Sequence, residues 1–165
     1  MIEENIKKAG IMHAQILSEK GLSELSELGV YSELVKVLSL EDLKFLSDIG
    51  VYFNPIFSPA SQTNIGKTIE HGSKVITIDI NSLRKFTQSE SVSIILHEIG
   101  HAINPWTKNE EGEYAADDYA IKRGYAEYII SSLEKGKRYW PEEFDKQITQ
   151  NRIDRIKELL KEAKQ

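Results

Sequence analysis

Residues 87–117 read TQSESVSIILHEIGHAINPWTKNEEGEYAAD, and this stretch determines the expected course of the second half of the chain. The T-x-x-E pattern that begins at Thr87 is a capping box, which predicts a helix starting there. Helical spacing continues to about Ile103, after which Asn-Pro stops the helix. A second T-x-x-E pattern begins at Thr107, so we expect an acidic helix that runs to about Arg123 and ends at a glycine.

The first of these helices carries the pentapeptide HEIGH at residues 97–101. Positions four apart share a helix face, so His97 and His101 can direct their imidazoles at one point. Zinc binds imidazole nitrogens at about 2.0–2.1 Å. Glu98 lies about 100° round the helix from His97, beside the metal, where its carboxylate can take a proton from water and pass it to a leaving amine. The small Gly100 lets another segment approach the helix closely.

A catalytic zinc site needs a third protein ligand besides these two histidines. No histidine follows His101, and the metzincin pattern fails because Asn104 and Thr107 occupy its glycine and histidine positions. The chain has no cysteine, which excludes thiolate ligands and disulfides. A carboxylate remains, and the acidic run EEGEYAAD from Glu110 to Asp117 offers several.

HEIGH followed by EYAAD resembles the gluzincin signature HExxH…ExxAD. That signature occurs in soluble minigluzincins, in membrane proteases of the heat-shock HtpX type and in small predicted peptidases of bacteria and phages. The resemblance covers roughly residues 75–125 and implies that Glu113 is the third zinc ligand. It also implies that Asp117 steadies a ligand histidine, and that a strand upstream of the metal helix binds substrate in an extended form. The membrane segments of the HtpX type are missing from this sequence, which implies a soluble substrate.

The best strand pattern in the chain is residues 74–80, which are β-branched at most positions. Together with residues 65–69 it flanks His71-Gly72, which predicts a β-hairpin with His71 as a turn residue. We expect residues 74–80 to form an edge strand that pairs with a substrate chain by β-augmentation. The residues predicted to bind substrate in this way are Val75, Ile76, Thr77 and Ile78.

The first 50 residues show helical periodicity interrupted by glycines. The first helix is expected to stop at Gly21 and the second at Gly29. Ser39 with Asp42 predicts the capped start of a further helix, which closes at Gly50.

These patterns predict an α+β fold with a helical N-terminal half, a small β-sheet and a zinc-binding helix packed on an acidic helix. A last helix is expected from Pro141, with an apolar stripe that includes Ile148, Ile153 and Ile156. No linker stands out, so we expect one metallopeptidase domain. Its expected parts are a helical region at 1–50, a catalytic core at 51–136 and a C-terminal helix at 137–165, within a domain spanning 1–165.

Charge and hydropathy exclude some classes of partner. The formal net charge is -5 and the basic residues are scattered, so no nucleic-acid interface is expected. No stretch approaches the roughly 20 apolar residues of a membrane span. The polar N-terminus has no signal-peptide pattern, which predicts a cytoplasmic location, or the host cytoplasm if the gene is viral.

The sequence as a whole therefore predicts a zinc-dependent peptidase that acts on a protein or peptide substrate, with Glu98 as general base. Two alternatives stay open. One is a non-catalytic binding or regulatory protein derived from a peptidase, in which zinc only stabilises the fold. The other is a peptidase restricted to one regulatory partner, such as a repressor.

Overall fold

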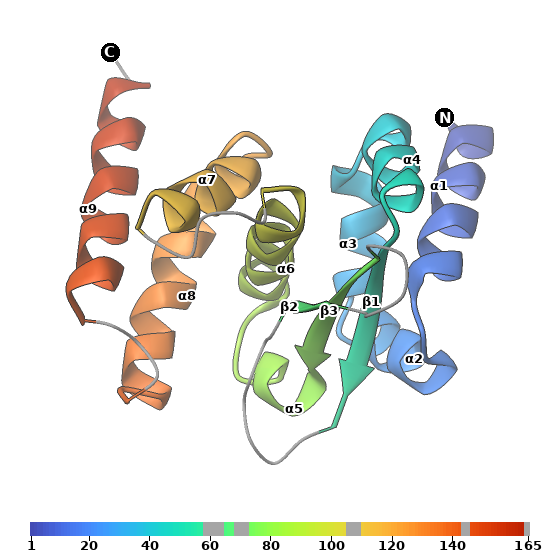
Figure 1. Ribbon diagram of the computed structural model, residues 1–165, viewed down its shortest axis with the longest axis horizontal. Helices are drawn as coiled ribbons and strands as arrows, with labels where there is room; N and C mark the ends of the chain where they lie inside the picture. Colours follow the sequence, from blue (N-terminus) through green and yellow to red (C-terminus); the bar gives the residue numbers. More distant parts are fainter. Residues whose placement is uncertain (58–64, 68–72, 105–109, 143–145, 164–165) are drawn as a thin grey trace. The chain divides into compact units, whose positions relative to one another are not determined.

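The computed structural model describes residues 1–57, 65–67, 73–104, 110–142 and 146–163 (Figure 1). It divides into two compact units, Met1–Gln88 and Ser89–Gln165. The boundary falls at the start of the expected metal helix, so it cuts through the region 51–136 that the sequence suggested as one core. That the chain forms one domain stays a prediction.

Helices make up most of the first unit, as predicted for residues 1–50. They are α1 (Ile2–Gln15), α2 (Glu19–Glu27), α3 (Val30–Val37) and α4 (Leu40–Asp48). The capping box of Ser39 and Asp42 at the start of α4 is confirmed. Gly29 and Gly50 follow α2 and α4 with φ of 71° and 68°, a left-handed conformation in which glycine is the favoured residue.

The prediction that Gly21 stops the first helix is wrong. Helix α1 ends at Gln15, because Ile16 is extended and forms a parallel bridge with Phe53. Gly21 lies in the first turn of α2, where a Cβ would stand 2.3 Å from the Cβ of Pro55. This glycine therefore serves a close approach between α2 and a strand.

The described residues contain a three-stranded sheet in the order β1-β3-β2. Strand β1 is Val51–Ile56, β2 is Ile65–Lys67 and β3 is Lys74–Asp79. The antiparallel pairing of β2 with β3 agrees with the predicted hairpin, whereas His71 and Gly72 lie outside the described residues. Pro55 lies in β1, which is at the edge of the described sheet, where a strand tolerates proline.

The expectation that residues 74–80 form an edge strand is wrong, because β3 is the middle strand. Val75 is in register with Tyr52 of β1 and with Gly66 of β2. Three of the four residues predicted to bind substrate, Val75, Ile76 and Ile78, are also buried. The prediction that a substrate chain pairs along this strand is therefore wrong. The strand ends at Asp79, and Ile80 opens the short helix α5 (Ile80–Leu83).

The regular elements described in the second unit are helices, as the sequence predicted, but the last helix begins at Lys146 and not at the expected Pro141, which lies in a turn (Figure 1). They are α6 (Gln88–Ile103), α7 (Glu110–Ile121), α8 (Ala126–Tyr139) and α9 (Lys146–Glu162). Helices α7, α8 and α9 contact one another. The α+β class with a helical majority is thereby confirmed. No helix in the described ranges has both the length and the hydrophobicity needed to cross a membrane.

Candidate metal centre

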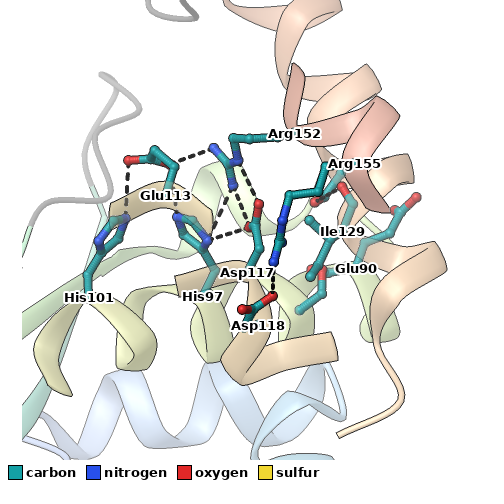
Figure 2. A network of polar contacts seen from close by, with 11 residues as sticks. Glu90, His97, His101, Glu113, Asp117, Asp118, Ile129, Arg152 and Arg155 are labelled. Carbon is teal, nitrogen blue, oxygen red and sulfur yellow. Dashed lines mark hydrogen bonds and ion pairs between the residues drawn. The ribbon is translucent and has the colours of Figure 1, made fainter. Parts of the chain in front are cut away.

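Helix α6 presents the two histidines of the HEIGH pentapeptide on one face (Figure 2). The ring centroids of His97 and His101 lie 4.5 Å apart, with the rings nearly perpendicular. Their side chains are 12% and 19% exposed, so both are largely removed from water but still reachable. The i, i+4 spacing thus brings the imidazoles together as expected.

Glu113 of α7 meets both imidazoles. Its Oε2 lies 3.4 Å from Nε2 of His97, and its Oε1 lies 3.3 Å from Nε2 of His101. The three possible ligand atoms lie within 4.8 Å of one another. Two imidazole nitrogens and one carboxylate oxygen are a donor set that suits zinc and leaves a position open for water or substrate. The structure therefore brings together the predicted ligands, while the bound metal itself stays a prediction.

The other acidic residues at the start of α7 point elsewhere. Oε1 of Glu110 accepts hydrogen bonds from Tyr114 at 2.5 Å and from Asn151 at 2.7 Å. Glu111 is exposed. Of the carboxylates in the run that the sequence offered, Glu113 is the one that faces both histidines.

Close packing of α6 on α7 accounts for this meeting. A Cβ added at Gly100 would lie 2.6 Å from the Cα of Ala116. The two helix backbones therefore touch between the histidines and the acidic residues, as the small side chains at these positions predicted. Ala116 lies between Glu113 and Asp117, so its contact with Gly100 fixes where both carboxylates lie along α6.

Asp117 supports His97 from behind. Its Oδ1 lies 2.8 Å from Nδ1 of His97, and its side chain is fully buried. Burial raises the pKa of Asp117, but the hydrogen bonds and charges of His97 and Arg152 lower it further, so the group stays ionised. An ionised carboxylate only accepts hydrogen bonds, so Nδ1 of His97 carries a proton and Nε2 is the nitrogen left for a ligand.

Arg152 of α9 belongs to the same cluster, although the sequence analysis did not single it out. Its Nη1 lies 2.7 Å from Oε2 of Glu113, and its Nη2 and Nε lie 2.7 and 2.9 Å from the two oxygens of Asp117. Arg152 stands four residues after Ile148 and four before Ile156, on the expected apolar stripe. A charged residue on an apolar stripe was the signal available in the sequence.

The charges in the metal-free cluster balance one another. Burial and the charge of Arg152 lower the pKa of His97, but hydrogen bonds to Asp117 and Glu113 outweigh them and raise it to about 9. Burial raises the pKa of Glu113, yet its hydrogen bonds to His101 and His97 and the charge of Arg152 bring it well below its usual range. At neutral pH the carboxylates are therefore ionised and His97 is protonated.

Glu98 lies next to His97 on α6 and is half-buried. Burial raises the pKa of its carboxyl group, and the lowering effect of the His97 and His101 charges does not offset this. A raised pKa brings a carboxylate closer to the working range of a general base at neutral pH. The environment of Glu98 thus suits the proton transfer assigned to it from the sequence.

Asp118 points away from the cluster. Its Oδ1 lies 2.7 Å from Nη2 of Arg155, one of the further contacts between α7 and α9 (Figure 2). His13, the histidine of α1, is exposed.

Comparison with known proteins adds no relative to this picture. No protein-family model, no curated protein and no solved structure matches the chain.

Proposed function

We propose that the protein is a zinc-dependent peptidase of the gluzincin type that hydrolyses peptide bonds in a protein or peptide substrate. The observation that carries the proposal is the convergence of His97, His101 and Glu113 on one point, with Asp117 bound to the far nitrogen of His97. This is the arrangement that the resemblance to HExxH…ExxAD implies. Structural zinc sites fill all four positions with protein ligands, whereas three ligands suit a catalytic site.

His97, His101 and Glu113 would hold the ion, and Asp117 would fix the orientation of His97. When bound, zinc supplies a Lewis acid and lowers the pKa of water to about 7. Glu98 takes the proton of the attacking water on its carboxylate and then gives it to the leaving amine. Its raised pKa favours the first half of this transfer, because it makes the carboxylate a stronger base.

The test compares wild-type protein with Glu98→Gln and His97→Ala. We expect about one zinc per wild-type chain by elemental analysis. Glu98→Gln should retain zinc and lose cleavage of casein or of a peptide library, because it removes the base but no ligand. His97→Ala should lose both zinc and activity.

Three results would separate the alternatives. Undiminished zinc in His97→Ala would contradict the metal site. Zinc without cleavage of any general substrate would favour either a non-catalytic protein or a peptidase with one partner. Cleavage that persists in Glu98→Gln would contradict the assigned base.

A further inference from the structure

We propose that Arg152 is a positioning residue of the metal centre, holding Glu113 and Asp117 in the ligand arrangement before any metal arrives. This inference rests on the proposed zinc site. Its basis is that Nη1 of the Arg152 guanidinium contacts the expected third ligand, while Nε and Nη2 contact the residue that orients His97. One planar group thus connects α9 to both carboxylates of α7 (Figure 2).

Glu113 needs such a support because its carboxylate is partly exposed. Its side chain is 28% exposed, so water competes for its oxygens. Arg152 engages Oε2, and Oε1 is the oxygen that faces His101. The guanidinium therefore selects one orientation of the carboxylate, in which Oε1 faces His101 and Oε2 lies near His97.

Asp117 depends on Arg152 even more strongly. This carboxylate is fully buried and makes bonds of 2.7 and 2.9 Å to the guanidinium. Removing a partner from a buried charge leaves an unsatisfied group that must find water or move. A shift of Asp117 would release the ring of His97, whose Nδ1 it binds.

The sign of the effect on zinc affinity distinguishes positioning from simple electrostatics. By Coulomb's law alone, removing a cation next to a bound Zn²⁺ should tighten zinc binding. Positioning predicts the opposite, because the ligands lose their orientation. A neutral replacement of Arg152 should therefore weaken Zn²⁺ binding if Arg152 positions the ligands, and tighten it if Arg152 acts only through its charge.

Arg155 provides a matched control on the same helix. Its Nη2 lies 2.7 Å from Oδ1 of Asp118, so it also joins α9 to α7 through an Arg–Asp pair. Asp118 does not take part in the histidine cluster. Arg155→Gln therefore measures how the loss of one ion pair between α9 and α7 changes Zn²⁺ affinity when the contacts of the expected ligands are kept.

The experiment measures Zn²⁺ affinity of the full chain by competition with a chromophoric chelator, for wild type, Arg152→Gln, Arg152→Lys and Arg155→Gln. We expect Arg152→Gln to bind Zn²⁺ about 10- to 100-fold more weakly, as is usual when a partner of a ligand is lost. Arg152→Lys should also lose about tenfold, because an ammonium cannot engage both carboxylates as the planar fork does. Arg155→Gln should stay within about twofold of wild type, since it changes a half-buried ion pair with Asp118 and a contact with the Tyr114 ring but no contact of the expected ligands.

A second readout is the visible absorption of the Co²⁺-loaded proteins at saturating Co²⁺. The ligand-field bands should change in both Arg152 variants and stay unchanged in Arg155→Gln, because only the Arg152 variants alter the arrangement of the ligands. Loss of helix docking alone would lower the thermal stability without changing these bands. Circular dichroism and thermal unfolding of each variant provide that comparison.

Several results would overturn the inference. Wild-type or tighter Zn²⁺ binding by Arg152→Gln would do so, as would wild-type binding by Arg152→Lys, which would show that a point charge suffices. An equal loss in Arg155→Gln would assign the effect to helix docking. If Arg152→Gln does not fold, Arg152→Lys decides the question. If the wild-type chain binds no Zn²⁺, the proposed function fails instead.

Discussion

Replacing Gly100 by alanine tests whether the contact between α6 and α7 sets the geometry of the metal centre. The added Cβ would lie 2.6 Å from Cα and 2.7 Å from the carbonyl oxygen of Ala116, whereas ordinary contact begins at 3.4 Å. The obstacle is backbone, so a side-chain rotation cannot relieve it. At Ala116, α7 would have to retreat by about 0.8 Å, the difference between 3.4 and 2.6 Å.

Two opposing terms decide the stability of this variant. Overpacking of this kind costs about 1–3 kcal/mol, whereas glycine to alanine within a helix gains about 1 kcal/mol. We therefore expect the free energy of unfolding to fall by about 0–2 kcal/mol. The effect on Zn²⁺ affinity should be larger than the effect on stability, because Glu113 and Asp117 flank Ala116 and move with it. Misplacement of a ligand and of its support should weaken Zn²⁺ binding by about tenfold or more.

Gly10→Ala is the control, because a Cβ added at Gly10 in α1 meets nothing within 4 Å. We expect this variant to gain up to about 1 kcal/mol and to bind Zn²⁺ as wild type does. Chemical unfolding of the metal-free proteins and chelator competition measure the two quantities. A Gly100→Ala protein with wild-type stability and wild-type Zn²⁺ affinity would refute the argument from close packing.

Three further predictions follow from the contacts already described. Zinc must displace a proton from His97, whose pKa is raised to about 9, so Zn²⁺ affinity should rise about tenfold per pH unit from neutral pH and level off above that value. The protonated imidazole also stabilises the metal-free fold at pH values below its unfolded pKa of about 6.5, and this stabilisation disappears as the pH rises through about 9. The Tm of the metal-free protein should therefore fall between these two pH values. A Zn²⁺ affinity that does not change with pH would contradict the raised pKa on which both predictions depend. Asp117→Asn should weaken Zn²⁺ binding about 10- to 100-fold in chelator competition, whereas Asp118→Asn should leave it unchanged, and equal losses would refute the distinction. Ser39→Ala should cost about 1 kcal/mol in chemical unfolding without changing Zn²⁺ affinity, and an unchanged free energy of unfolding would show that the observed cap contributes nothing.

Much of the fold and most of the site could be predicted from the sequence, because the signals are local. The capping box at Ser39 lies within four residues, and HEIGH places His97 and His101 through helical spacing alone. Choosing Glu113 among neighbouring acids required the resemblance together with the expected packing of two adjacent helices. Each of these steps depends on residues close together in the chain.

The errors arose where the deciding contact is distant in the sequence. Gly21 is a packing glycine because Pro55 lies against it, and nothing near Gly21 shows this. Strand β3 is central because β1 pairs with it, and the proline in β1 weakens the strand signal of that segment in the sequence. Arg152 joins the site across 35 residues from Asp117. Its only local trace is a charge on an apolar stripe.

The order of the cluster along the chain bears on when it is completed during synthesis. The histidines come first, Glu113 and Asp117 follow on the next helix, and Arg152 comes only after the whole of α8. A chain growing from the N-terminus therefore contains the expected ligands before it contains the guanidinium that holds them. At the proposed zinc site, full affinity should require α9, the last described helix, so the site should be completed only when this unit folds as a whole.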